Sequence, residues 1–254
     1  MKRNLKLVLE YDGSRFHGWQ YQVGVRTVQG VFEEALARLT GERIRTIAAS
    51  RTDAGVHALG QVVNFRTESR HSPEVFLRAL NALLPRDIAV LSCEEVDYKF
   101  NARFWAEGKI YRYIIYNHPI RRAFGHKYFW HIADKINIKA MREGAKYLIG
   151  IHNFSSFQAR SRDQLEKDPV REVKRIDIYN GKNNYICIEI EARSFLKQMA
   201  RNIVGTLILA GRGKIPPEGI KQILEAQDRR MAGPTAPAGG LYLVKVFYPK
   251  EKEK

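Results

Sequence analysis

The sequence predicts an α+β fold of two ferredoxin-like β-α-β-β-α-β units, joined in one mostly antiparallel sheet with helices on one face and a cleft between the units. Three observations predict this fold. Apolar residues alternate along some segments, they recur at three and four positions along others, and the order of these segments is repeated. The repeat places the first unit at residues 1–100 and a second, more basic unit at residues 101–254.

In the first unit, apolar residues alternate along residues 5–11, which is the period of a strand with one buried face. Helical spacing of apolar residues over 28–39, followed by Gly41, predicts a helix with a glycine stop. Ser72 is an N-cap residue, and the proline after it begins a second helix that extends to residue 84. The other strands of this unit are expected at residues 44–49, 61–65 and 87–95.

In the second unit, the same order begins with a strand at residues 109–116 and a helix that Asn137 caps and Gly150 ends. The turn residues at 180–183 lie between two strand-like segments, which predicts a β-hairpin. A helix is expected over 194–210. The other strands are expected at residues 171–179, 185–191 and 241–248.

The charge of the chain indicates a polyanionic partner. Lys and Arg number 43 against 27 Asp and Glu, which gives a formal net charge of +16. Residues 101–254 hold 29 basic and 15 acidic groups, so most of the excess lies in the second unit. RNA and DNA fit this charge equally, and a generally basic surface is the alternative.

The sequence lacks the common metal and cofactor motifs. Its seven histidines include no HExxH pair, and Cys93 and Cys187 form no CxxC motif. Neither GxxxxGK[ST] nor GxGxxG occurs, so we expect no metal or redox cofactor. We also expect a soluble, cytoplasmic protein, because the longest apolar run falls far short of the ~20 residues that span a bilayer.

The segment RTDAGVH, residues 51–57, lies between two predicted strands and carries the first candidate site residues. Asp53 is a carboxylate that a loop presents, and Arg51 lies two residues from it. The alternative is a turn in which Asp53 binds its own backbone and Gly55 takes a positive φ. The chemistry of these residues leaves both interpretations open.

Two aromatic groups have similarly open interpretations. The segment 11–20 mixes glycines, aromatic and basic residues, which suits an RNA-contacting loop, but Phe16 and Trp19 also suit the core. Tyr111 and Tyr113 share one face of a predicted strand, where they either face a cleft or pack across strands.

Arginines are the remaining candidates. Arg201 lies in a largely apolar helix, where it either is buried with a partner or is solvated at the helix edge. We interpret Arg121, Arg122, Arg229 and Arg230 as phosphate contacts or solvated surface.

Motifs along nearly the whole chain carry a family resemblance. They are YDGSRFHGWQ, TVQ, RTDAGVHALGQVVNF, NARF, YRYIIYN, FLKQMARNIVG and APAGGLYLVKVFYP. In this order they resemble the bacterial tRNA pseudouridine synthase A family. RTDAGVH is the most specific of them, and the resemblance favours a catalytic Asp53 over a turn residue. Ser50 departs from the family, where many relatives have glycine, but the change removes no catalytic group.

The resemblance implies a homodimeric enzyme that isomerises uridine to pseudouridine at positions 38, 39 and 40 in the anticodon stem and loop of tRNA. It implies catalytic roles for Asp53 and Arg201, with Arg201 pairing with Asp53, and a substrate-binding Tyr111 against the uracil ring. Arg51 is a candidate contact to the flipped nucleotide. The isomerisation transfers no electrons, which agrees with the missing cofactor motifs.

Two other function classes fit less well. A non-catalytic basic RNA-binding module is compatible with the charge and the aromatics, but it leaves Asp53 without a role, and the chain has no close match to the RNA recognition motif segment. A phosphodiester-cleaving nuclease is expected to carry clustered carboxylates or a general acid and base pair. The enzyme interpretation is therefore preferred.

Overall fold

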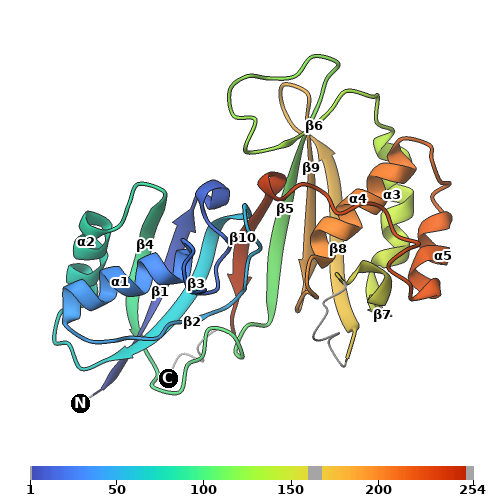
Figure 1. The fold of residues 1–254 in the computed structure, drawn as a ribbon. Coiled ribbons are helices and arrows are strands. Elements are labelled where there is room, and N and C mark those ends of the chain that lie inside the picture. Colours follow the sequence, from blue (N-terminus) through green and yellow to red (C-terminus); the bar gives the residue numbers. More distant parts are fainter. Residues whose placement is uncertain (1, 160–167, 250–254) are drawn as a thin grey trace. The chain divides into compact units, whose positions relative to one another are not determined.

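The computed structural model describes residues 2–159 and 168–249, and the chain forms two compact units (Figure 1). The first unit comprises Met1–Glu107 and Tyr242–Lys254, and the second comprises Gly108–Leu241. Each unit combines helices with mostly antiparallel strands, so the predicted α+β class is confirmed. The division differs from the expected one at residues 100 and 101, because the last strand packs with the first unit.

The first unit has the predicted β-α-β-β-α-β order. Its strand β1 pairs antiparallel with β3 and β4, and β2 pairs antiparallel with β3, which is the ferredoxin-like arrangement. The last strand, β10, pairs parallel with β3 through Tyr242 and Leu243, along the same edge as β2. The bounds are β1 Arg3–Tyr11, α1 Val28–Thr40, β2 Ile47–Ala48, β3 His57–Thr67, α2 Pro73–Leu83, β4 Ile88–Val96 and β10 Leu241–Phe247.

Local sequence signals explain these elements well. The alternating residues of β1 are at most 2% exposed on one face, which α1 and α2 cover (Figure 1). Thr27 caps α1 by accepting a hydrogen bond from Gly30 N, and Gly41 ends the helix at φ 74°. Ser72 caps α2 in the same way, as predicted.

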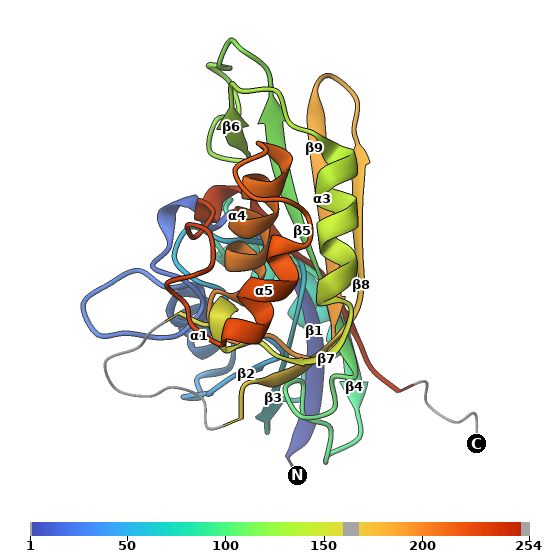
Figure 2. The ribbon, with the colours of Figure 1, turned by 90° about the vertical axis from the view of Figure 1, so that its right-hand side faces the viewer.

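The second unit repeats part of this order. Its sheet is ordered β5-β9-β8-β7 with antiparallel neighbours, so β5, β9 and β8 correspond to β1, β3 and β2 of the first unit. β6 pairs with β5, and α3, α4 and α5 pack against one another beside the sheet (Figure 2). The bounds are β5 Gly108–Asn117, β6 Trp130–Ile132, α3 Ile138–Ala145, β7 Gly150–Asn153, β8 Val170–Asn180, β9 Tyr185–Ala192, α4 Met199–Gly211 and α5 Gly219–Ala226.

Two predicted boundaries in this unit are wrong. The helix expected over 194–210 begins only at Met199, because Gln198 has a left-handed backbone with φ 59°. The helix that Asn137 caps ends at Ala145, and the chain then tightens into a 3-10 turn before Gly150 enters β7. The predicted hairpin is confirmed by the antiparallel pairing of β8 and β9.

The sequence did not predict β6, β7 or α5. Among the described residues, no helix is long and apolar enough to cross a membrane.

α4 is buried almost all round, because the other helices and the chain that follows α5 cover it.

Candidate functional site

The loop between β2 and β3 carries Arg51 and Asp53. Arg51 is exposed and Asp53 is partly exposed. Val56 N donates to Asp53 O at 3.1 Å, which closes a β-turn, and Gly55 in this turn has φ 77°. The backbone turn that the sequence permitted is therefore present, and Asp53 is its first residue.

A second loop, residues 12–20, packs directly on the backbone of the Asp53 loop. Trp19 N donates to Thr52 O at 3.0 Å, and Gly55 N donates to Phe16 O at 3.3 Å. A Cβ atom at Gly18 would lie 2.7 Å from Thr52 O, closer than real Cβ contacts. The two backbones approach at a distance that only glycine permits.

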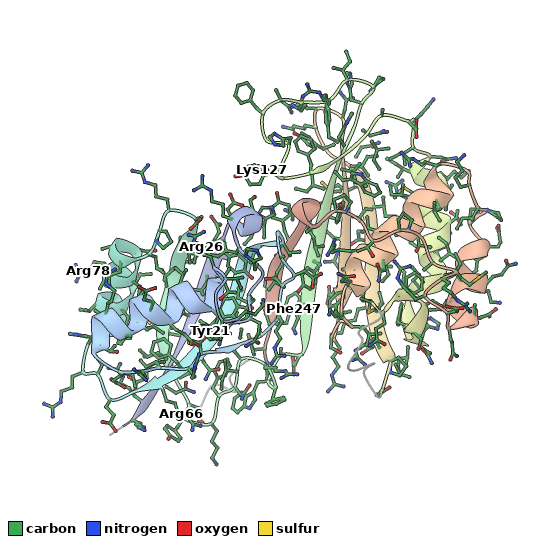
Figure 3. The ribbon with its side chains drawn as sticks, in the orientation of Figure 1. Tyr21, Arg26, Arg66, Arg78, Lys127 and Phe247 are labelled. Carbon is green, nitrogen blue, oxygen red and sulfur yellow. The ribbon has the colours of Figure 1, made fainter. Side chains whose placement is uncertain are left out.

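Gly13 makes the same kind of approach further along the loop. A Cβ atom there would lie 2.0 Å from Val56 O. Phe16 and Trp19 are buried, so within this unit they serve as core residues. Arg26 stabilises the loop from outside, because its guanidinium lies 4.0 Å from the Phe16 ring centroid and makes a forked ion pair with Asp87 (Figure 3).

Buried polar groups fix the Asp53 loop from below. Tyr11 Oη lies 2.8 Å from Thr52 Oγ1. Gln61 donates from Nε2 to Ser50 O at 2.7 Å and accepts from Ser50 N at 3.2 Å. Ser50 is not among the described non-glycine residues with positive φ, so serine replaces glycine here without backbone strain. Sequence reasoning missed Tyr11 and Gln61, because each looked like an ordinary strand residue.

His57 connects the two loops at their other end. Gly13 N donates to His57 Nδ1 at 3.1 Å, and Asp12 Oδ1 lies at the same distance from that nitrogen. Asp12 Oδ1 also accepts from Ser14 N. These contacts connect the start of the 12–20 loop to the first residue of β3.

In the second unit, Tyr111 and Tyr113 lie on one face of β5 and are both buried. The Tyr111 ring meets the Phe195 ring edge-to-face at 4.9 Å between centroids. Tyr113 Oη donates to Pro237 O at 2.7 Å. Burial raises the pKa of Tyr113, against the opposing effect of the nearby Arg201 charge.

Arg201 lies in the first turn of α4 and does have a partner within its unit. Its Nε donates to Ala236 O at 2.7 Å, while Ala236 N donates to Arg201 O at 3.2 Å. Arg201 and Tyr113 thus bind the carbonyls of two successive residues, Ala236 and Pro237. These residues belong to a segment, 232–240, that we call the strap because it crosses α4.

Arg229 holds the start of the strap. Its guanidinium donates to Gly233 O at 2.9 Å, to Asn202 Oδ1 at 3.0 Å, to Thr235 Oγ1 at 3.1 Å and to Ala232 O at 3.3 Å. Burial lowers the pKa of Arg229. The interpretation of Arg229 as a phosphate contact or solvated residue is therefore wrong, whereas Arg230 is exposed and pairs with Asp228.

The helix itself accommodates the strap. A Cβ atom at Gly205 would lie 1.7 Å from Pro234 O, so the strap backbone touches the helix backbone. Thr206 Oγ1 accepts from Gly233 N at 2.9 Å, and Asn202 Nδ2 donates to Phe157 O at 2.7 Å. Sequence reasoning missed Asn202 and Thr206, because their partners, Phe157 O and Gly233 N, are backbone groups distant in sequence.

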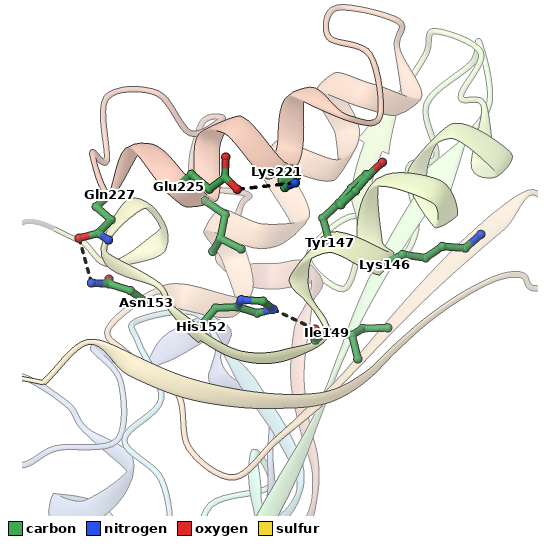
Figure 4. Close-up of a pocket in the computed structure, with 9 residues that line it drawn as sticks. Lys146, Tyr147, Ile149, His152, Asn153, Lys221, Glu225 and Gln227 are labelled. Atoms are coloured by element: carbon green, nitrogen blue, oxygen red, sulfur yellow. Dashed lines mark hydrogen bonds and ion pairs between the residues drawn. The ribbon is translucent and has the colours of Figure 1, made fainter.

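A separate pocket of about 350 Å³ lies between α5 and β7 (Figure 4). Two of its lysines have acidic neighbours: Lys146 Nζ is 2.6 Å from Glu143, and Lys221 Nζ is 3.8 Å from Glu225. A ring nitrogen of His152 lies 2.9 Å from Ile149 O. We assign this pocket no role, because its charges are balanced locally. Within residues 2–159 and 168–249, no group of three or more His, Cys, Asp and Glu side chains is arranged to hold a metal ion.

Comparison with known proteins gives a consistent family. A family model described as tRNA pseudouridine synthase matches residues 7–105 and 145–249. The chain is 48% identical to tRNA pseudouridine synthase A of Thermosipho melanesiensis over 249 residues, which cover 98% of this chain and all of that protein. It is 46% identical to the enzyme of the same name from Acetivibrio thermocellus over 246 residues, 97% of this chain and all of the relative. The Asp53 loop, α4 and the strap lie inside the matched ranges, and Tyr111 lies between them.

Proposed function

Because this chain belongs to the tRNA pseudouridine synthase family, we propose that it isomerises uridine to pseudouridine in tRNA, at positions 38, 39 and 40 of the anticodon stem and loop. The observation that carries the proposal is the RTDAGVH loop. Its carboxylate residue, Asp53, begins a turn whose backbone is in close contact with two glycines of the neighbouring loop. Rigid placement of a reacting group is what catalysis needs and what a turn residue does not.

We propose that Asp53 is the catalytic carboxylate. The reaction breaks the bond from ribose C1′ to N1 and forms one from C1′ to C5, and C5 loses a proton while N1 gains one. Asp53 either attacks C1′ to form a covalent intermediate or removes a ribose proton on the way to a glycal. Either path leaves the redox state unchanged, so we propose that the enzyme needs no redox cofactor or metal.

We propose that Tyr111 binds the target base. A uridine must leave its stack before its glycosidic bond can be reached, which costs a few kcal/mol. Stacking on an aromatic side chain returns roughly 1–3 kcal/mol. The edge-to-face contact with Phe195 fixes the plane of the Tyr111 ring, which supports this role. A further role for the hydroxyl is to accept the proton that C5 loses.

We propose that Arg201 contributes positive charge to the reaction, and that Arg51 contacts the phosphate of the flipped nucleotide. The Arg201 guanidinium is fixed by Ala236, so its charge is placed without further loss of side-chain entropy. Arg51 is exposed on the same loop as Asp53, two residues away, within reach of the same nucleotide. Arginine suits phosphate because its donors form a planar fork.

We further propose that the enzyme acts as a homodimer in the cytoplasm. The dimer rests on the family resemblance alone. Free Cys93 and Cys187 fit a reducing compartment. Sedimentation of the purified protein measures the oligomeric state directly.

Incubating purified protein with an unmodified tRNA transcript, without added metal or nucleotide, tests the activity. Pseudouridine is mapped at each anticodon-arm uridine for wild type, Asp53→Asn and Asp97→Asn. Asp53→Asn keeps the shape of the side chain but should reduce turnover by more than about 1,000-fold, because amide oxygen is a poor nucleophile and base. Asp97→Asn is the matched control, since Asp97 is an exposed loop residue of the same unit that accepts a hydrogen bond from Lys99 N.

Binding of the same tRNA to each variant separates catalysis from affinity. Normal binding with lost turnover in Asp53→Asn supports the proposal. A folded wild type that binds several tRNAs and makes no pseudouridine refutes it and favours the non-catalytic RNA-binding module. Equal turnover in wild type and Asp53→Asn refutes only the role of the carboxylate and leaves the proposed activity intact.

A further inference from the structure

The connection between β5 and β6, residues 118–129, belongs to one of the two longest stretches of the chain that lack an acidic residue. Between Glu107 and Asp134 there is no acidic residue, while there are five Lys and Arg residues and three histidines. This stretch also lies outside the ranges that the family model matches. Neither the catalytic loop nor the strap includes it.

The tip of this connection, which we call the β5–β6 loop, is exposed. Every residue from 119 to 128 is exposed, and Phe124 and Ile120 expose 90% and 70% of their surface. Large apolar side chains are usually buried in folded proteins. Their exposure here, beside several cations, therefore calls for a functional explanation. Within the part of the chain that the structure describes, no carboxylate pairs with Arg121.

The base of the loop, in contrast, is fixed. Arg122 Nη1 donates to Tyr185 Oη at 2.9 Å, and its guanidinium lies 5.6 Å from the Tyr116 ring centroid. Tyr116 packs against Phe129 and His131 in the same cluster. Arg122 is therefore a structural residue of the loop.

The loop also touches the strap of the candidate site. A Cβ atom at Gly239 would lie 2.4 Å from Lys127 O, so the backbones of loop and strap are in direct contact (Lys127 is labelled in Figure 3). Gly240, the next residue of the strap, packs against the Tyr113 ring. A ligand held by the loop is thus held next to the strap of the same unit.

We propose that the β5–β6 loop is a tRNA contact in which Phe124 stacks on an unpaired base and Arg121 binds a backbone phosphate. This inference rests on the proposed function for the identity of the RNA. An exposed aromatic ring beside an arginine is the chemistry that binds unstacked nucleotides. A second copy of the chain is the other occupant to consider. A two-fold contact between two such loops brings like charges together, which disfavours that occupant.

Binding of an unmodified tRNA transcript to the full-length protein tests the proposal. Phe124→Ala should weaken binding by roughly 5- to 150-fold, which is the range for loss of one stacked base. Phe124→Trp should restore binding, because indole also stacks. Ile151→Ala, which trims another largely exposed apolar residue on β7, is the control and should leave binding unchanged.

The phosphate contact has its own measurement. Arg121→Ala should make the dependence of log Kd on log salt shallower by about one unit, as expected for one lost phosphate contact. Arg78→Ala removes the same charge from the exposed face of α2 and should leave the slope unchanged (Figure 3). Melting temperatures close to wild type are expected for all these variants, because the substituted side chains are exposed.

The outcomes separate this inference from the proposed function. Pseudouridine formation with normal tRNA binding by Phe124→Ala and Arg121→Ala overturns the loop contact and leaves the function intact. If the wild type binds tRNA but makes no pseudouridine, and these variants bind tRNA more weakly than the wild type, the loop contact is supported and the proposed function is refuted. A changed sedimentation coefficient with unchanged tRNA binding shows that the loop joins two copies of the chain, which also overturns the inference.

Discussion

The two units hold their candidate functional segments by different balances of backbone contact and side-chain hydrogen bonds. In the first unit, the Asp53 loop lies against glycine backbones, with Gly13 and Gly18 at distances that exclude a Cβ atom. In the second unit, long polar side chains reach out to the strap, above all Arg229 and Arg201. Close backbone approach dominates at the Asp53 loop, whereas the strap combines such an approach at Gly205 with a network of arginine hydrogen bonds.

This difference determines which substitutions each unit tolerates. Backbone contacts leave no room for adjustment, so any side chain at the glycines must displace a loop. A network of side-chain hydrogen bonds fails in steps, because each bond contributes separately and water can replace some of them. The Asp53 loop should therefore respond sharply to small changes, and the strap should respond in a graded way.

Gly18→Ala is expected to have the largest effect on stability. The new methyl group would lie 2.7 Å from Thr52 O, and the residue has φ 87°, which alanine rarely adopts. The two effects together should lower the free energy of unfolding by about 3–5 kcal/mol and reduce pseudouridine formation strongly. Urea unfolding followed by circular dichroism measures the first, and tRNA modification the second.

Two other glycines separate the two causes. Gly24 has φ 78° but no neighbour within 4 Å, so Gly24→Ala should cost only about 1–2 kcal/mol and leave activity unchanged. Gly13→Ala introduces the clash with Val56 without a positive φ, and it should resemble Gly18→Ala. Equal costs at Gly18 and Gly24 would show that backbone contact between the loops contributes nothing.

Arg229→Ala should have an intermediate effect. It removes the guanidinium bonds to the strap and leaves buried acceptors such as Gly233 O unsatisfied, at about 2–4 kcal/mol. Arg229→Lys keeps the charge but cannot reproduce the fork, so it should recover part of that cost. Urea unfolding gives the stability of each variant.

Arg230→Ala is the matched control for Arg229. It is the neighbouring arginine, exposed and paired with Asp228, so its removal should change stability by less than about 0.5 kcal/mol. If Arg229 positions the strap for catalysis, Arg229→Lys should lower kcat at saturating tRNA while the Kd for tRNA stays unchanged. A rise in Kd alone would instead make Arg229 a binding residue.

Sequence patterns predicted the elements whose signals are local. The N-cap Ser72 and the stop at Gly41 explain why α1 and α2 could be predicted, since each lies within four residues of its hydrogen-bond partner. The helix at 194–210 was predicted too long because Phe195 lies at helical spacing from Met199 and Ile203, yet the left-handed Gln198 precedes the helix. Apolar spacing indicates burial, and the buried Leu196 precedes the helix without being helical.

The residues of the candidate site also divide into those that local sequence signals predict and those that depend on distant contacts. The RTDAGVH motif identified the Asp53 loop from contiguous residues, although the roles of its residues stay predictions. Arg229 was misinterpreted because its guanidinium also bonds to Asn202 Oδ1 of α4, 27 residues away, and this contact forms only when the chain returns to α4. No residue type or spacing in the sequence indicates such a return. The same holds for β10, which pairs with β3 of the first unit although it follows the second in sequence.

The smallest expected effect is a difference between the two units in how their stability depends on pH. Burial raises the pKa of the Cys93 thiol, on β4 of the first unit, from 9.0 to about 12. The protonated thiol therefore stabilises the fold below pH 9, and this contribution is lost as the pH rises from about 9 to about 12. The loss should be less than about 1.4 kcal/mol per pH unit, because the thiol is only partly buried. Cys93→Ala should therefore flatten the fall in stability of the first unit over this range, measured by hydrogen exchange of β1 and β4 amides. Burial also raises the pKa of Cys187 on β9, so Cys187→Ala should act on the second unit instead. An equal response of both units to Cys93→Ala would mean that they unfold as one body, and the contrast between the two units would then concern their loops alone.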